Sequence, residues 1–384
     1  MKISYGKQSI TEEDIDEVVK VLKSDYLTQG PKVKEFEDRF AGYVDAKYAV
    51  AVSNGTAALH ISNLAIGTKP GDKVLTTPIT FVASANAILY CGGEVDFVDI
   101  DKDSYLLDLD KLEEKLKNAP KGAYKGVIPV DLAGYPIDVE RLRKIADEYG
   151  LWIIEDACHA PGAFFTDNNG VNQYCGNGAY ADLQIFSFHP VKHIATGEGG
   201  MVTTNNEELY KKLLNYRTHG IQQDKTLWKE NHGVWYYEMQ ELGFNYRLTD
   251  IQAALGISQL TRAREGLEKR QRIAKKYDEA FKHVLNVVIP KREDNIYHAF
   301  HLYIIKTNSR DKLIKHLRVN GIFAQVHYIP VHLQQYYKNL GWGRGDLPVA
   351  EEYYDNALSI PIYPTLSDEE QDFVIEKILE VINE

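Results

Sequence analysis

The run Leu151-Trp152-Ile153-Ile154-Glu155-Asp156 says most about the architecture of this chain. Its four consecutive apolar residues predict a strand that is buried on both faces, because a strand with one wet face alternates apolar and polar residues. Strands of this kind are typical of parallel sheets that helices cover on both sides. The acid at the tip is a candidate site residue, because ligands of such sheets gather at the carboxyl ends of the strands.

Similar short apolar runs, separated by helical patterns, occur throughout the first 204 residues. The expected strands cover residues 48–52, 73–77, 94–98, 126–130, 152–155, 183–188 and 200–204. Those that helices and short loops connect form crossover units of a parallel sheet. We therefore predict an α/β fold with a mostly parallel seven-stranded sheet.

The regions on either side of this alternation differ from it. Residues 10–23 predict a helix that Thr11 caps, and a second amphipathic helix extends to about Tyr43. Beyond residue 250 we expect a long charged helix over about 251–280, strands near 300–306 and 322–326, and a final helix over 368–382. These patterns predict a large domain over residues 1–250 and a smaller α+β C-terminal domain over residues 251–384.

The overall charge argues against two classes of partner. The net charge is −11, whereas nucleic acids and anionic membranes favour clustered lysine and arginine. We expect neither as a partner, although backbone amides can still bind a phosphorylated ligand. No stretch approaches the ~20 apolar residues of a membrane span, and residues 1–7 lack an apolar signal segment, so we expect a cytoplasmic protein.

The cysteines predict no metal site and no disulfide framework. Cys91, Cys158 and Cys175 are odd in number and have no C-x-x-C spacing. Unpaired cysteines of this kind are typical of a reducing compartment.

The run Phe186-Ser187-Phe188-His189-Pro190-Val191-Lys192 places a lysine just beyond a predicted strand, and a glycine cluster follows it. Tight turns there hold the amine in place, as Schiff-base chemistry requires. Only a neutral amine attacks a carbonyl, and we expect His189 and His193 to help lower the pKa of Lys192. A solvated surface lysine is the alternative interpretation.

A phosphate site is indicated where Val52-Ser53-Asn54-Gly55-Thr56 turns from a strand into an alanine-rich helix. The free amides and the positive dipole end of the helix favour a phosphate, and Gly55 lets the backbone approach it closely. Ser187 could donate its hydroxyl to the same phosphate. An ordinary capped helix and a polar strand end fit these residues as well.

Asp156 and Lys192 together indicate one cofactor. An acid that keeps a pyridine nitrogen protonated and a lysine on the aldehyde carbon are the protein groups on which pyridoxal phosphate chemistry most depends. His159 could hydrogen-bond the ring hydroxyl or stack nearby, and Phe81 could lie over the ring. A satisfied core histidine and a core aromatic residue are the alternatives for these two. We expect pyridoxal 5′-phosphate as the cofactor.

Taken in order, these segments resemble the sugar aminotransferases of the DegT/DnrJ/EryC1/StrS family, which belong to fold type I of the pyridoxal phosphate enzymes. The likeness covers nearly the whole chain. Its motifs lie at residues 27–37, 53–59, 80–87, 155–160, 196–202 and 243–254.

The resemblance implies a role for each matching residue. Lys192 corresponds to the Schiff-base lysine and proton shuttle, and Asp156 to the partner of the pyridine nitrogen. The residues implied to hold the rest of the cofactor are Gly55, Thr56 and Ser187 at the phosphate and Phe81 on the ring. Asn245 matches an asparagine that reaches the phosphate from the neighbouring subunit, which implies a homodimer with shared active sites.

The resemblance also implies the substrates. Family members typically move an amino group from L-glutamate to a nucleotide-linked keto sugar. His159 stands where many members carry glutamine, and with residues 186–192 it resembles the subgroup of pseudaminic acid biosynthesis. That subgroup aminates C4 of a UDP-linked 2-acetamido-2,6-dideoxy-4-keto sugar. The residues implied to line its sugar-nucleotide pocket are Tyr5, Asp25, Tyr26, Leu27, Thr28, Gln325, Val326, His327 and Tyr328.

Other functions remain open at this point. The amino acceptor could be another nucleotide-linked keto sugar, such as a dTDP-4-keto or 3-keto sugar. One family branch removes a sugar hydroxyl, but it lacks the lysine that this chain carries at position 192. A ligand-sensing regulator without catalysis is a third reading, against which the lysine–aspartate pair and the lack of a helix-turn-helix signature argue. Residues 222–241, rich in tryptophan and tyrosine, match no motif and suggest an interface or lid.

Overall fold

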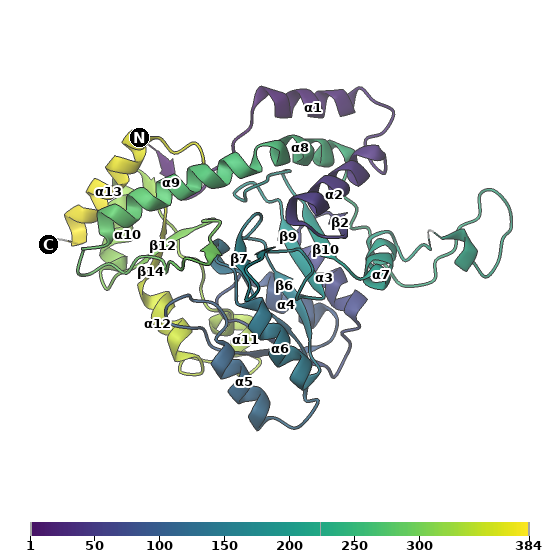
Figure 1. Cartoon of the computed structure of the whole chain (residues 1–384), viewed down its shortest axis with the longest axis horizontal. Helices are drawn as coiled ribbons and strands as arrows, with labels where there is room; N and C mark the ends of the chain where they lie inside the picture. The colour runs from purple at the N-terminus through teal and green to yellow at the C-terminus, as the bar shows by residue number, and fades with distance from the viewer. Residues whose placement is uncertain (1, 223, 383–384) are drawn as a thin grey trace.

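In the computed structural model, which describes residues 2–222 and 224–382, seven strands form one central sheet (Figure 1). From edge to edge they are β2 (Tyr48–Val52), β10 (Gly200–Thr204), β9 (Leu183–Ser187), β6 (Trp152–Asp156), β5 (Tyr124–Ile128), β3 (Lys73–Thr76) and β4 (Glu94–Phe97). Neighbours from β9 to β4 are parallel, whereas β10 runs antiparallel to both β9 and β2. The predicted α/β fold with a mostly parallel seven-stranded sheet is confirmed.

One predicted strand is shifted along the chain. We expected it at residues 126–130, but β5 ends at Ile128. Pro129 follows, and because proline has no N–H to donate to the ladder, it ends the strand. The other six predicted strands agree with the observed bounds to within one residue at each end.

Helices cover both faces of the sheet (Figure 1). One face carries α3 (Gly55–Ile66), α4 (Ala83–Tyr90) and α7 (Glu207–Arg217). The other face carries α2 (Pro31–Val44), α5 (Leu109–Asn118) and α6 (Val139–Tyr149). Val50 and Val52 pack with the first group of helices, and Ala49 and Ala51 pack on the opposite face. The continuous apolar strands therefore follow from burial on both sides.

The single long helix that we predicted over 251–280 is wrong, because two helices, α8 (Asp250–Thr261) and α9 (Ala263–Phe281), occupy this stretch. Arg262 separates them with backbone angles outside the helical region. Its guanidinium reaches α1 (Glu12–Leu22), where Nη1 donates to the Asp14 carboxylate at 2.8 Å. A contact between residues far apart in the chain thus interrupts a helix whose local sequence is continuous.

A second hydrophobic core lies toward the C-terminus and includes the N-terminal Ile3. Its strands are β1 (Ile3–Ser4) paired in parallel with β13 (Ile322–Phe323), and β12 (Tyr303–Lys306) paired antiparallel with β14 (Ala357–Ile360). Its helices include α10 (Arg310–Val319) and α13 (Asp368–Ile382), whereas α11 (Gln335–Lys338) and α12 (Pro348–Asn356) pack against the core of the central sheet. A small sheet of β7 (Phe164–Thr166), β8 (Asn172–Tyr174) and β11 (Ile296–Tyr297) connects the two regions.

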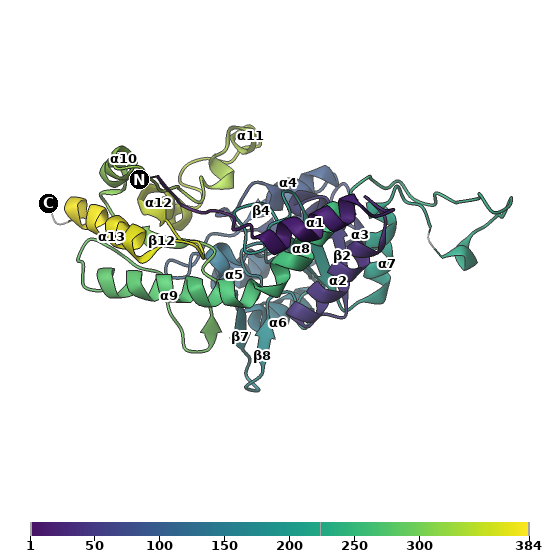
Figure 2. The same ribbon diagram turned by 90° about the horizontal axis from the view of Figure 1, so that it is seen from above.

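Residues 224–242, which we call the arm, extend from the body beyond α7 in both views (Figures 1 and 2). The arm exposes large apolar side chains: Val234 is 100% exposed, Leu242 78% and Trp235 75%. Several exposed apolar side chains in one segment are typical of a surface that contacts another molecule, and we interpret the arm in this way. Among the described residues, no helix is both long enough and apolar enough to cross a membrane.

Candidate active site

A cavity of about 830 Å³ opens at the carboxyl ends of β6 and β9, where the sequence placed the site. The predicted site residues that line it are Tyr5, Gly55, Thr56, Phe81, Asp156, His159, Ser187, Lys192, His327 and Tyr328. They are spread from residue 5 to residue 328 of the sequence, and the fold brings them together.

Asp156 ends β6, and its carboxylate is held by two donors. The Ser84 hydroxyl donates to Oδ2 at 2.7 Å, and the Cys158 N–H donates to Oδ1 at 3.2 Å. Hydrogen bonds to both oxygens fix the orientation of the carboxylate. Ser84 lies at the start of α4, within the motif of residues 80–87, but the local sequence does not indicate its contact with Asp156.

Lys192 lies in a turn after β9, where its N–H donates to the His189 carbonyl at 2.8 Å. Burial lowers the pKa of Lys192, and the neighbouring Cys158 and Asp156 act in the opposite direction. The expected contribution of the flanking histidines is wrong: His189 is exposed, and the His193 Nε2–H donates to the Ala299 carbonyl at 3.0 Å. Desolvation, the loss of contact between the amine and water, explains the lowered pKa.

The beginning of α3 forms a cradle beside Ser187. Asn54 caps the helix by accepting a hydrogen bond from the Ala57 N–H at 2.8 Å, and Gly55 is the first helical residue. A Cβ atom on Gly55 would lie 3.1 Å from the Ser187 Cβ, so a larger residue would crowd the cradle. Helix-end amides with a hydroxyl beside them suit a phosphate.

His159 is fixed by two hydrogen bonds. Nδ1 accepts from the Ala133 N–H at 3.2 Å, so the proton of the neutral ring is on Nε2, which lies 3.2 Å from the Tyr328 hydroxyl. Burial lowers the pKa of His159 well below its ordinary value, and the charge of Lys192 adds to the effect. The imidazole is therefore neutral at pH 7.

Several predicted site residues lie outside this cavity in the single chain. They are Asp25, Tyr26, Leu27, Thr28, Asn245, Gln325 and Val326. Asn245 is exposed, and its backbone pairs with Thr218. Conversely, Asn54, Tyr246 and His301 line the cavity although the sequence indicated no role for them. One local pattern could have indicated His301 as a site residue, because two histidines precede a strand in Tyr297-His298-Ala299-Phe300-His301.

The cavity residues fit pyridoxal phosphate. Asp156 and Lys192 supply the acid and the amine, and the cradle at Gly55 leaves room for a phosphate. Phe81 lines the same cavity with 59% of its surface exposed, so its ring is free to cover a flat ligand.

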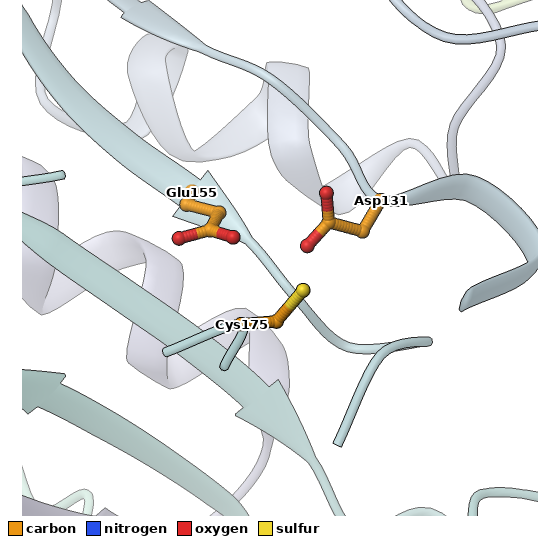
Figure 3. A group of neighbouring side chains, drawn as sticks. All are labelled: Asp131, Glu155 and Cys175. Carbon is orange, nitrogen blue, oxygen red and sulfur yellow. The ribbon is translucent and has the colours of Figure 1, made fainter. Parts of the chain in front are cut away.

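A buried acidic cluster lies next to this site (Figure 3). Asp131, Glu155 and Cys175 place ligand-type atoms within 4.8 Å of one another, and Figure 3 shows the Asp131 carboxylate directed toward the other two side chains. Asp131 Oδ2 has no hydrogen-bond partner among the described residues. Burial raises the pKa of Asp131 to about 6 and that of Glu155 well above its ordinary value. Two carboxyl groups this close also disfavour simultaneous ionisation, so the pair tends to keep a shared proton.

Comparison with known proteins gives consistent matches over the whole length. The DegT/DnrJ/EryC1/StrS aminotransferase family model matches residues 8–379. An uncharacterized protein, MJ1066, of Methanocaldococcus jannaschii is 40% identical, with 98% of this chain and 96% of the relative covered. A UDP-4-amino-4,6-dideoxy-N-acetyl-β-L-altrosamine transaminase of Campylobacter jejuni is 38% identical, with 99% and 97% covered. The solved structure of PseC from Helicobacter pylori, an aminotransferase of pseudaminic acid biosynthesis, superposes with a TM-score of 0.89 at 30% identity, covering 100% of both chains.

Proposed function

This chain belongs to the DegT/DnrJ/EryC1/StrS aminotransferase family and is a pyridoxal phosphate-dependent sugar aminotransferase, and we propose that it moves the amino group of L-glutamate to C4 of a UDP-linked 2-acetamido-2,6-dideoxy-4-keto-hexose. One observation carries the proposal: Lys192 and Asp156 line the same cavity, and the carboxylate acts on the pKa of the amine. The similarity to UDP-sugar transaminases supports the choice of sugar.

We assign a separate role to each group of cavity residues. When bound, pyridoxal phosphate supplies an electron sink for the carbon that carries the amine. Asp156 holds a proton at the pyridine nitrogen. Lys192 would hold the cofactor through Nζ and would move a proton at the reacting carbon as a general base and acid. The proposed ligands of the phosphate are Gly55, Thr56 and Ser187, with Phe81 over the ring and His159 at its edge.

Tyr5, His327 and Tyr328 form the proposed sugar-binding wall. The rings of Tyr5 and His327 lie 4.9 Å apart, and His327 Nδ1 lies 2.9 Å from the Ser359 hydroxyl. Burial lowers the pKa of His327 to about 3, so the ring is neutral at pH 7. Neutral donors and acceptors on aromatic rings suit an uncharged sugar. We assign residues 25–28, Gln325 and Val326 to the nucleotide end of the substrate.

We propose that the enzyme is a homodimer with shared active sites. Lys192 is the one lysine in the described lining of the cavity, which contains no arginine, although the ligands bring a phosphate and carboxylates. Further anion-binding groups must therefore come from elsewhere, and a second copy can supply the exposed Asn245. The apolar side chains of the arm fit the same interface. The cysteines, all three unpaired, fit a cytoplasmic location.

Turnover measurements on the purified holoenzyme test the proposal. The enzyme is incubated with L-glutamate and a panel of UDP-4-keto, dTDP-4-keto and 3-keto sugars, and NMR identifies the carbon that gains the amine. We expect amination at C4 of the UDP sugar with release of 2-oxoglutarate. Turnover of another member alone would reassign the acceptor. The absence of turnover with every sugar would overturn the proposed acceptors.

A further inference from the structure

His301 lines the cavity beside Lys192 and packs against two other histidines. Its ring centroid lies 4.3 Å from that of His159, tilted by 42°, and 5.6 Å from that of His193. The side chain is 5% exposed, and Nδ1 is enclosed without a hydrogen-bond partner among the described residues. Because no hydrogen bond fixes this nitrogen, packing and the backbone must hold the ring of His301 in place.

Arg270 of α9 holds the backbone at this position. It is 1% exposed, and its Nη1 donates to the carbonyls of Phe300 at 3.0 Å, His301 at 3.3 Å and Ile362 at 3.0 Å. Among the described residues it pairs with no carboxylate. Three carbonyls of the C-terminal region thus accept from Nη1 of a buried cation, whose Nε has no partner among the described residues. One of these carbonyls belongs to His301, which lines the cavity.

The ring of His301 covers one face of His159. The two hydrogen bonds of His159 require a single state, in which Nδ1 accepts from Ala133 and Nε2 carries the proton. A second proton on Nδ1 would face the Ala133 N–H and break the first bond. Burial lowers the pKa of both His159 and His301. The other charged or titratable groups that act on these two rings, all in the same direction, are Lys192, His193, His327 and Arg270.

We propose that His301 is a positioning residue for transamination: packed on His159 and fixed by Arg270, it holds His159 in the one orientation and the neutral state that the Ala133 and Tyr328 contacts require. The inference rests on the proposed placement of His159 beside the cofactor. The ring of His301 acts through its shape, because its enclosed Nδ1 has no partner.

The test compares His301→Ala with His301→Phe, which keeps a ring at the same place. Two quantities are measured: the titration of the His159 ring by NMR of ¹³C-histidine-labelled apoprotein, assigned with His159→Gln, and the dissociation constant of pyridoxal phosphate. In His301→Ala we expect His159 to titrate between about pH 5 and 8 and the dissociation constant to rise about tenfold. His301→Phe should keep both wild-type properties.

His332→Ala is the matched control, because His332 is fully buried and lies 3.1 Å from Glu351, outside the cavity. It should lower the thermal midpoint without changing either quantity. A changed titration with an unchanged dissociation constant would support the positioning role and remove the proposed cofactor contact of His159. The inference is overturned if His301→Ala leaves the titration unchanged, or if His301→Phe is as damaging as His301→Ala.

Discussion

The Asp156 carboxylate and the Lys192 amine line one cavity, and each comes from the end of a different strand of the same sheet. The carboxylate counteracts part of the fall that burial causes in the pKa of the amine. The two groups therefore interact electrostatically in the single chain, although 35 positions separate them in a sequence of 384 residues.

Lys192→Ala should abolish the function while preserving the fold. The variant loses the amine that we propose holds the cofactor and moves the proton, so we expect kcat to fall by at least about 10³-fold. The visible absorption band that the holoenzyme owes to the cofactor held at Lys192 should also disappear. Lys144→Ala removes an exposed lysine of α6 and should behave like the wild type. A Lys192→Ala enzyme that keeps both its band and its turnover would refute the assignment.

Asp156→Asn should lower kcat, while the cavity still binds the cofactor. The change keeps the shape but removes the negative charge that favours a protonated pyridine nitrogen, an effect of about two pKa units and so about a hundredfold in kcat. Steady-state kinetics measure the loss. Ser84→Ala removes only the hydroxyl that donates to Asp156 at 2.7 Å, and its loss should be smaller. Equal losses in both variants would mean that orientation, rather than charge, is the contribution of Asp156.

The sequence predicted the sheet and the central pair for physical reasons. Continuous apolar strands identify a parallel sheet, and in such a sheet the carboxyl ends of the strands meet at one edge. Asp156 ends one such strand and Lys192 lies in the turn after another, so their meeting could be predicted without coordinates. The cradle at Gly55 could also be predicted from the local sequence, because a helix begins there.

Features that depend on distant contacts could not be predicted. Arg262 interrupts a helix because it reaches Asp14, and no local pattern records that contact. His301 joins the site through a turn that Arg270 supports from α9. The pKa of Lys192 is lowered by burial, which a sequence does not display, rather than with the expected help of the flanking histidines.

Mixing two inactive variants should test whether the sites are shared. If Asn245 serves the cavity of a second copy, a heterodimer of Lys192→Ala and Asn245→Ala contains one site with both changes and one intact site. Equal mixing after unfolding and refolding together should restore about a quarter of the wild-type rate. Each variant refolded alone is the control and should stay inactive. No recovery, in a mixture that sedimentation shows to be dimeric, would mean that Asn245 acts within its own chain.

The Asp131–Glu155 pair should make stability depend on pH. Burial raises the pKa of Asp131 from an ordinary 3.8 to about 6 in the folded protein. Between these values the unfolded chain has released a proton that the folded protein keeps, so a rise in pH through this window favours unfolding. The cost that Asp131 contributes, on the order of 3 kcal/mol, is present above about pH 6 and absent below about pH 4.

Asp131→Asn removes this cost, because the amide can accept from the Ile137 N–H and donate to Glu155 without ionising. The thermal midpoint of the variant, relative to the wild type, should therefore be higher at pH 7.5 than at pH 4.5, as circular dichroism measures in a buffer series. Asp16→Asn, on the exposed face of α1, should change by the same small amount at both values. A difference that stays constant or falls with pH would show that the cluster does not hold the shared proton, because only a proton kept by the folded state produces a rising difference.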